Sequence, residues 1–273
     1  MLCRAKVNLT LHVGAPIASG GGWEGYHPVE SLVVFADVGD RVSVSPADQT
    51  SLIIDGPFGE GLTAGPDNLI LKAMTACEAP PQTLRLTKNL PVSSGLGGGS
   101  ANAAAILRLF DSQGAVDAVS LGADVPVCRL SQTAMMTGIG ERVTPLPDLG
   151  SVAAVLVNPR IPVSTARIFA RFDDGNPQGE PALTSRTGSL LDRARSGTNA
   201  LESAAVKEAP AIQFVLDALR EQADCQLARM SGSGASCFGI FASDASARAA
   251  AACLSQKGWW AVATRLGDSG DPS

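Results

Sequence analysis

Four glycines crowd into five positions of the segment 90–110, LPVSSGLGGGSANAAAILRLF, between an apolar lead-in and an alanine-rich run. Glycine permits positive φ angles and lets a ligand approach the backbone closely. The helix predicted from Ser100 onward would offer unpaired N–H groups and the positive end of its dipole. These features suit an anion, most naturally the phosphates of a nucleotide. The alternative is a turn with close helix–strand packing, but the adjacent Ser93, Ser94 and Ser100 favour the phosphate site.

Two common nucleotide-binding motifs do not fit this segment. A Walker A loop needs Gly-Lys-Ser/Thr, which is missing. Gly95-Leu96-Gly97 begins a dinucleotide fingerprint, but no acidic residue follows about 20 positions later at a strand end. Asp111 and Asp117 come too early, so the pattern argues against a dinucleotide-binding oxidoreductase.

A second candidate group lies at the start of the chain. Apolar and polar residues alternate there, which predicts a β-strand with Lys6 and Asn8 on one face. The alternative is a lysine at a sheet edge that points into water, the default for a lone strand lysine. The alternating residues are Val7, Leu9, Leu11 and Val13 on one face and Lys6, Asn8, Thr10 and His12 on the other.

Two further segments carry candidate groups. Asp124 stands in LGADVPVCRL, where it either contributes a carboxylate to a site or caps a turn. The segment 230–241, MSGSGASCFGIF, holds Gly232, Ser233 and Gly234 in a polar loop before a predicted strand. A plain hairpin turn is the alternative for this loop.

The composition indicates a globular protein of one large or two modest domains. Of the 273 residues, 45% are hydrophobic and 17% charged, which allows a sizeable core and argues against disorder. The net charge of −5 and the lack of a Lys/Arg run argue against nucleic acid or an anionic membrane as partner. The chain opens without an apolar signal segment and has no run long enough to span a membrane, so we expect a cytoplasmic protein.

The cysteines predict neither a metal site nor a disulfide framework. The chain has six cysteines and two histidines, and no pair of cysteines forms a CxxC motif. This pattern argues against a zinc cluster, so no metal ligand is assigned. Dispersed cysteines are typical of small buried residues in a reducing compartment. They are Cys3, Cys77, Cys128, Cys225, Cys237 and Cys253.

Hydrophobic periodicity predicts a mixed α/β chain with two lobes. We expect the boundary near residues 146–150, a glycine-rich hairpin over 14–28 and a long loop over 173–189. Strands are predicted over 7–13, 29–45, 83–92, 151–159, 237–242 and 259–264, and helices over 63–77, 100–110, 209–222 and 243–258.

Together these motifs resemble the GHMP kinase superfamily over nearly the whole chain. LPVSSGLGGGSANAA is similar to its ATP-binding motif, LGADVPVC to its catalytic aspartate segment and MSGSGASCFG to its C-terminal glycine loop. AKVNLTLHV, GYH, GADVPV and PVSTARIF resemble the branch of the superfamily that acts on diphosphocytidyl-methylerythritol. GIGERVTPL and TNALE follow in the order of that branch.

The resemblance implies a fold and a reaction. The fold would be the two-domain α/β (α+β) GHMP kinase fold, with an ATP-binding and catalytic domain over 1–147 and a ferredoxin-like, substrate-binding domain over 148–273. The reaction would be ATP-dependent phosphorylation of the 2-hydroxyl of 4-diphosphocytidyl-2-C-methyl-D-erythritol, in the non-mevalonate route to isoprenoids. ATP and Mg²⁺ would be the cofactors, the partner a small molecule, and the protein a monomer or weak homodimer.

The resemblance also assigns roles to residues. Lys6 would lie near the reacting hydroxyl and the γ-phosphate, and Asp124 would accept the hydroxyl proton. Tyr26 and Phe169 would enclose the cytosine ring, while His27 reads its polar edge. Asn8, Thr165 and Gly234 would lie around the substrate and the phosphates. The ATP phosphates would be wrapped by Pro91, Val92, Ser93, Ser94, Gly95, Leu96, Gly97, Gly98, Gly99, Ser100 and Ala101.

Two departures and two alternatives accompany this interpretation. The chain between Ala101 and Asp124 is shorter than the family pattern, which leaves the adenine pocket unassigned, and the hairpin carries extra glycine and Trp23. Another kinase of the superfamily, of homoserine or mevalonate type, is disfavoured by the pair Tyr26-His27. A non-catalytic nucleotide sensor is disfavoured because binding alone requires neither a lysine nor an aspartate at the reacting centre.

Overall fold

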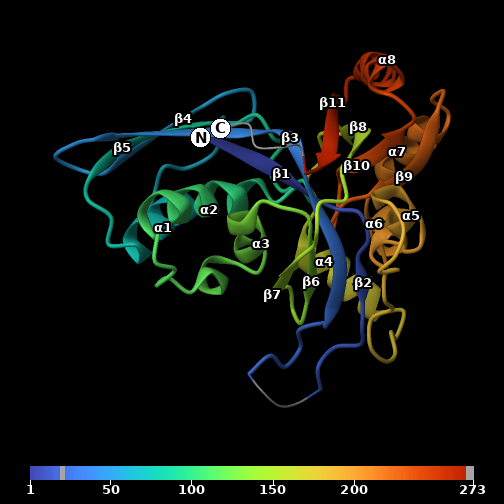
Figure 1. Ribbon diagram of the computed structural model, residues 1–273, viewed down its shortest axis with the longest axis horizontal. Coiled ribbons are helices and arrows are strands. Elements are labelled where there is room, and N and C mark those ends of the chain that lie inside the picture. The colour runs from blue at the N-terminus through green and yellow to red at the C-terminus, as the bar shows by residue number, and fades with distance from the viewer. Residues whose placement is uncertain (19–21, 269–273) are drawn as a thin grey trace.

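The computed structural model describes residues 1–18 and 22–268 and shows two halves joined by one sheet (Figure 1). Within those residues the strands form an eleven-stranded sheet whose main path runs β4-β5-β3-β11-β8-β10-β9. The first half contains β1 (Leu2–Asn8), β2 (His12–Val13), β3 (Val29–Pro46), β4 (Ser51–Asp55), α1 (Leu69–Ala76), β5 (Gln82–Thr87), α2 (Gly98–Phe110), the 3₁₀ helix η1 (Ala118–Leu121), α3 (Val125–Leu130), β6 (Ala134–Thr137) and β7 (Arg142–Pro145). The second half contains β8 (Ser151–Asn158), α4 (Thr165–Asp173), α5 (Leu190–Arg195), α6 (Glu202–Glu208), α7 (Ala211–Arg220), β9 (Cys225–Met230), β10 (Cys237–Phe241), α8 (Asp244–Ser255) and β11 (Trp260–Gly267).

The first half is organised by β3, its longest strand. β1, β5 and β6 pair with β3 in antiparallel fashion, and β4 adds in parallel to β5. The helices α1, α2 and α3 lie together on one side of this sheet (Figure 1). Their shared core includes Phe35, Leu84, Ile106 and Leu107. The apolar face of α2 is thereby fixed against the sheet, and its N-terminus has a defined position.

The second half has the ferredoxin-like strand order. Its four strands follow each other in space as β11-β8-β10-β9, all antiparallel, which is the order 4-1-3-2 in chain terms. β11 also pairs with β3 through Leu266 and Ala36, and this pair joins the two halves. The predicted fold class is therefore confirmed. The predicted boundary after residue 147 falls between β7 and β8 and stays a prediction.

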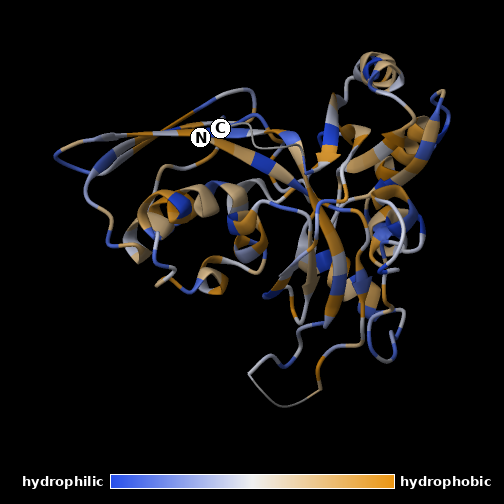
Figure 2. Ribbon diagram, in the orientation of Figure 1, coloured by the Kyte–Doolittle hydropathy of each residue, from blue (hydrophilic) through white to orange (hydrophobic). Residues whose placement is uncertain are grey.

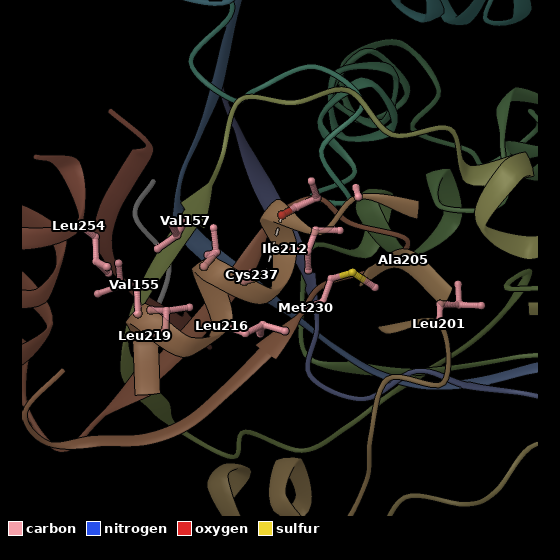
Figure 3. Close-up of a cluster of buried hydrophobic side chains, with 14 of the residues drawn as sticks. Val155, Val157, Leu201, Ala205, Ile212, Leu216, Leu219, Met230, Cys237 and Leu254 are labelled. Atoms are coloured by element: carbon pink, nitrogen blue, oxygen red, sulfur yellow. Dashed lines mark hydrogen bonds between the residues drawn. The ribbon is translucent and has the colours of Figure 1, made fainter. Parts of the chain in front are cut away.

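The helix α7 shows why the second half packs as it does. Ile212, Val215, Leu216 and Leu219 are all fully buried, as their helical spacing predicts. Figure 3 shows Ile212, Leu216 and Leu219 in one cluster with residues of β8, and Figure 2 shows apolar residues along the strands of both halves. Complete burial of a side chain of this size contributes about 1.5–3 kcal/mol.

The prediction of one strand over residues 7–13 was wrong. β1 ends at Asn8 and β2 consists of only His12–Val13, because Leu11 between them bonds elsewhere. Its N–H donates to Thr198 O and its C=O accepts from Ala200 N, both in the second half. The hairpin over 14–28 is confirmed by the pairing of β2 with β3, although its residues 19–21 lie outside the described range. The predicted loop over 173–189 contains no helix or strand beyond the last residue of α4.

The prediction of buried cysteines holds for half of them, since Cys77 and Cys225 are half-buried and Cys253 is exposed. All six are free, and Cys3, Cys128 and Cys237 are buried. Burial raises the pKa of the Cys3 thiol to about 12, so this group is inert at neutral pH. In the part of the chain that is described, no helix is both long and apolar enough to cross a bilayer.

Candidate active site

One cleft of about 1200 Å³ opens between the two halves. The first half contributes β1, the glycine-rich segment that leads into α2, and the residues just before α3. The second half contributes the start of α4 and the loop between β9 and β10. The wall includes these predicted site residues: Lys6, Asn8, Pro91, Val92, Ser93, Ser94, Gly95, Gly97, Gly98, Gly99, Ser100, Asp124, Thr165 and Phe169.

Lys6 and Asp124 form an ion pair in this cleft. Lys6 Nζ lies 2.9 Å from Asp124 Oδ2 and donates a hydrogen bond to Asn8 Oδ1 at 2.8 Å. The Lys6 side chain is only 5% exposed, so it is not the water-exposed edge lysine of the alternative. Asp124 is the N-cap residue of α3, but its side chain makes no capping hydrogen bond. The carboxylate is therefore available to Lys6 and to a ligand in the cleft.

Asn8 connects this pair to both halves of the protein. Its Nδ2 donates to Ser31 Oγ at 2.7 Å, and its backbone N–H donates to Ser231 Oγ at 3.1 Å. The Ser231 hydroxyl in turn donates to Gly95 O at 3.0 Å. The polar face of β1 is buried by these bonds, and the side chain of Asn8 holds the Lys6 ammonium in place.

The glycine-rich segment turns sharply before α2. Ser93, Gly95 and Gly97 have positive φ angles of 50°, 75° and 63°. A Cβ at Gly95 would come within 2.3 Å of Ser231 O. A Cβ at Gly97 would come within 3.1 Å of Lys6 Cβ. Both positions therefore require glycine, because the backbone conformation and the close contacts exclude a side chain.

The start of α2 can accept an anion. Gly97 is its N-cap residue and provides no side-chain cap. Gly98, Gly99 and Ser100 line the cleft, so their N–H groups lie where a ligand can meet them. Lys6 packs against Gly97, which places the ammonium group close to this helix terminus. The arrangement combines a helix N-terminus, a lysine and a carboxylate within one wall.

Three of the residues predicted around the phosphates and the substrate, Leu96, Ala101 and Gly234, lie away from the wall. Ala101 is buried in the core of the first half, and Leu96 in a cluster shared by both halves, so they anchor the two ends of the glycine turn. Gly234 belongs to the loop between β9 and β10 but does not line the cleft. A Cβ there would come within 2.8 Å of Met230 Sδ. Its neighbour Ser233 does line the cleft and shares a hydrogen bond of 2.8 Å with Thr165 Oγ1.

The residues assigned to a base are less closely assembled. Phe169 lines the cleft, and its ring centroid lies 5.0 Å from that of His27, with the planes tilted by 31°. Tyr26 is 54% exposed and contacts the ring of Trp23 edge-on at 5.5 Å. Among the described residues of the cleft wall, neither Tyr26 nor His27 is present. The structure thus brings His27 and Phe169 together and leaves Tyr26 at the surface.

His27 has a defined tautomer and an unused nitrogen. Its Nε2 lies 2.9 Å from Asp173 Oδ1, so Nε2 carries the proton and donates it to the carboxylate. Burial lowers the pKa of His27 below its usual range, although the charge of Asp173 opposes the shift. The ring is therefore neutral at pH 7. Its Nδ1 is a lone-pair acceptor, buried and without a partner among the described residues.

Sequence reasoning missed a buried ion pair below the glycine turn. Lys88 Nζ donates to Asp40 Oδ2 at 2.5 Å, and Asp40 Oδ1 accepts the backbone N–H groups of Asn89 and Leu90 at 2.8 Å each. Lys88 Nζ would lie 2.9 Å from a Cβ at Gly98. The pair fixes the strand end that leads into the turn. Its only signals in the sequence were an aspartate within the longest strand and a lysine just ahead of the glycine turn.

Asn102 was missed as well. It lines the cleft one turn into α2 and is buried. Its Oδ1 has no hydrogen-bond partner in the described part of the chain. A buried acceptor on the wall of a cleft is suited to a donor group of a ligand. The signal was present in the sequence as the polar residue within the alanine run SANAAA.

The chain matches two family models. Residues 68–130 match the GHMP kinases N terminal domain, and residues 181–258 match the GHMP kinases C terminal model. The first range includes the glycine turn and Asp124, and the second includes the loop between β9 and β10.

Curated relatives resemble the chain over nearly its full length. It is 45% identical to the 4-diphosphocytidyl-2-C-methyl-D-erythritol kinase of Paracoccus denitrificans over 267 residues, which cover 96% of this chain and 94% of the relative. It is 44% identical to the kinase of the same name from Ruegeria pomeroyi over 281 residues, covering 96% and 97% of the two chains. A crystal structure of 4-(cytidine 5'-diphospho)-2C-methyl-D-erythritol kinase superposes with a TM-score of 0.80 at 30% identity, covering 98% of this chain and 99% of the other.

Proposed function

Because the chain belongs to the GHMP kinase family, and within it to the 4-diphosphocytidyl-2-C-methyl-D-erythritol kinases, we propose that Lys6 and Asp124 act together in ATP-dependent phosphorylation of the 2-hydroxyl of that diphosphocytidyl alcohol. The chain is an ATP-dependent kinase of a small molecule, and its reaction is a step of the non-mevalonate route to isoprenoids. The alternatives of homoserine or mevalonate type are disfavoured by relatives that are 44% and 45% identical and carry the diphosphocytidyl name.

The observation that carries the proposal is the ion pair of Lys6 and Asp124 beside the N-terminus of α2. Phosphoryl transfer depends mainly on positioning and on stabilising the charge of the transferred oxygens. Asp124 orients the acceptor hydroxyl and takes its proton as the new bond to phosphorus forms. Lys6 holds the Asp124 carboxylate by a direct contact and adds positive charge near the transferred group. A sensor that only binds nucleotide has no use for this pair.

The glycine turn fits a nucleoside triphosphate. The uncapped N–H groups at Gly98, Gly99 and Ser100 would donate to phosphate oxygens, and the helix dipole favours their negative charge. Asn102 Oδ1, buried and unpaired on the same wall, would accept a hydrogen bond from a donor group of the nucleotide.

The donor set also fits Mg²⁺ bound largely through ATP. Residues 1–18 and 22–268 contain no group of three or more His, Cys, Asp or Glu side chains able to hold a metal ion. Mg²⁺ commonly takes one or two carboxylates together with nucleotide phosphates and water. The Ser100 hydroxyl at the start of α2 is the group of the wall that would hold it beside the phosphates, and the ion would neutralise charge on them.

The base end would recognise cytosine. Tyr26 and Phe169 would provide flat aromatic faces, which stabilise any base by about 1–3 kcal/mol and do not choose among bases. Choice requires polar atoms directed at the edge of the ring. The neutral His27 offers an acceptor at Nδ1, which suits the amino group of cytosine and opposes the carbonyl that uracil carries there.

We expect, further, that the protein acts in the cytoplasm as a monomer or weak homodimer and binds no nucleic acid. These expectations rest on the acidic composition and on the lack of a run of basic residues, and they stay predictions.

Phosphorus NMR tests the proposed reaction directly. The protein would be incubated with ATP, Mg²⁺ and a panel of alcohols: diphosphocytidyl-methylerythritol, its uridine analogue, homoserine and mevalonate. We expect ADP and a new phosphomonoester signal with the cytidine compound and much slower turnover with the others. Preferred turnover of homoserine or mevalonate, or binding of ATP without any transfer, would contradict the proposal.

A further inference from the structure

The cleft must bind two polyanions and has few positive charges. Under the proposed function, ATP and a diphosphate-linked alcohol occupy it together. Among the described residues of its wall, Lys6, Lys88 and Arg167 are the cationic side chains. Lys6 is paired with Asp124, and Lys88 with the buried Asp40. Both lysines are 5% exposed, so neither can turn to a second ligand without leaving a carboxylate unpaired.

Arg167 differs from both lysines in its exposure. Its side chain is 71% exposed and pairs with Glu208, which also lines the cleft. Glu208 is only 13% exposed, but the Arg167 end of the pair lies in water, where solvent and salt screen its charge. Arg167 can therefore leave its partner at low cost.

Glu208 does not lose its charge partner when Arg167 leaves. Arg171, one turn further along α4, donates from Nε to Glu208 Oε2 at 3.0 Å, and its Nη2 lies 3.0 Å from the same oxygen. Arg167 contacts the other oxygen, Oε1. The half-buried carboxylate thus remains neutralised by Arg171 while the Arg167 guanidinium is free to bind another anion.

The position of Arg167 along α4 identifies that anion. Thr165, two residues before it, bonds to Ser233 of the glycine loop between β9 and β10, and Phe169, two residues after it, contacts His27 at the base end. A substrate with its base at Phe169 and its reacting hydroxyl at Asp124 has its diphosphate between these two points. Among the described residues of the wall, Arg167 is the exposed cationic side chain, and α4 contributes it together with Thr165 and Phe169.

We propose that Arg167 binds the diphosphate of the acceptor substrate, exchanging Glu208 for phosphate oxygens, and so helps to select a nucleoside-diphosphate-linked alcohol over a neutral one. The inference rests on the proposed function. Arginine suits this role because its planar guanidinium donates two parallel hydrogen bonds to phosphate oxygens. The exchange is possible because Arg171 stays paired with Glu208 when Arg167 leaves it.

The test compares cytidine 5'-diphosphate with cytidine as ligands. Titration calorimetry would be performed with a saturating non-hydrolysable ATP analogue, which keeps both probes out of the nucleotide site. The variants are Arg167→Gln and, as the matched control, Arg171→Gln, which removes a cation from the same helix and the same carboxylate but not from the cleft wall. Arg167→Lys keeps the positive charge but removes the planar guanidinium that donates two parallel hydrogen bonds.

The wild type should bind the diphosphate more tightly than cytidine by about ten- to a hundred-fold, the range for a charge-assisted hydrogen bond. Arg167→Gln should abolish most of that ratio without changing the affinity for cytidine, and Arg167→Lys should retain part of it. Arg171→Gln should lower it much less than Arg167→Gln, because Arg167 remains on the wall although Glu208 then competes for it. An unchanged ratio in Arg167→Gln, or an equal loss in Arg171→Gln, would overturn the inference. A wild type that binds neither probe would overturn the proposed base site, and with it this inference.

Discussion

The site as proposed has a reacting end at Lys6 and Asp124 and a base end at Tyr26, His27 and Phe169. The two ends differ in how far they are assembled without a ligand. At the reacting end, Lys6 is buried, bonded to Asp124 and Asn8, and packed against Gly97. At the base end, Tyr26 is half exposed, and His27 leaves a buried nitrogen without a partner.

The roles proposed for the two ends account for this difference. Charge stabilisation in phosphoryl transfer is effective when the groups are fixed beforehand, because they need no reorganisation during the reaction. A site that admits a flat ring must be open until the ring enters. Under the proposed function, the chemistry would be built into the fold, whereas recognition of the base would be completed by the ligand.

Removing the carboxylate should break the reacting end with the largest effect. Asp124→Asn keeps the size of the side chain and loses the group that accepts the hydroxyl proton. We expect kcat to fall by about 10²–10⁴-fold, the usual contribution of a general base. The affinity for ATP, measured by calorimetry, should stay within a few-fold. Near wild-type kcat would refute the role of Asp124. Asp217→Asn is the control, because it removes an ion pair of the same 2.9 Å length from the exposed face of α7 and should leave kcat unchanged.

A side chain in the glycine turn should affect ATP most. Gly97→Val forces a β-branched residue into a positive φ and against the Lys6 side chain. We expect the KM for ATP to rise at least ten-fold, kcat to fall as Lys6 moves, and the KM for the acceptor to change least.

Gly99→Ala is the matched control for this variant. A Cβ at Gly99 meets only Leu69 Cδ1, at an ordinary 3.4 Å, so ATP binding should change little. Equal losses for ATP and acceptor in Gly97→Val with an unchanged melting temperature would contradict the phosphate site. Loss of both with a collapsed melting temperature would mean that the turn serves packing alone.

The aromatic surface of the base end should affect binding rather than turnover. Tyr26→Ala removes one stacking face, so we expect the KM for the acceptor to rise about ten- to a hundred-fold with a smaller change in kcat. Trp23→Ala should have a weaker effect, because it removes a ring that packs edge-to-face with Tyr26 rather than a proposed stacking face. A fall in kcat with an unchanged KM would place Tyr26 in the chemistry and remove the distinction between the two ends.

Protonation of His27 should give the smallest effect, and the direction in which it changes the KM for the acceptor is clearly defined. Burial lowers its pKa below the usual value of 6.5, so the folded protein resists protonation of the ring. With ATP saturating, the KM for the acceptor should be constant from pH 8 to about 6.5 and should rise at lower pH, as Nδ1 gains a proton and stops accepting. Asp173 raises the pKa of His27, so Asp173→Asn should move this rise to still lower pH. If the wild-type KM for the acceptor instead increased as the pH was raised above 7, the assignment of a neutral, accepting His27 would be contradicted.

Local patterns predicted the elements whose packing is local. α2, α7 and α8 follow from helical periodicity, and β3 and β8 from runs of apolar and β-branched residues. β9 was missed because it is short and partly exposed, and α4 because its polar composition hides its one buried residue, Ile168. β1 was placed too far along the chain, because contacts with the second half replace the strand at Leu11.

The candidate site was predicted as a set of residues rather than as an arrangement. Motifs identified Lys6, Asp124 and the glycine turn, but only the fold brings Lys6 within 2.9 Å of Asp124. The pair of Asp40 and Lys88 could not be predicted, because a buried ion pair between distant segments has no local pattern. The contact of His27 with Asp173, which sets its tautomer, depends in the same way on tertiary structure.

The most direct test of a prebuilt reacting end and a selective base end is one ratio: kcat/KM for the cytidine acceptor divided by kcat/KM for its uridine analogue. The wild type should favour cytidine by about ten- to a hundred-fold, because the wrong base leaves a buried acceptor unpaired. His27→Ala should reduce this ratio to within a few-fold of one and leave kcat on the cytidine compound nearly unchanged. A wild type that uses both compounds equally would contradict the account, since cytosine recognition would then be absent.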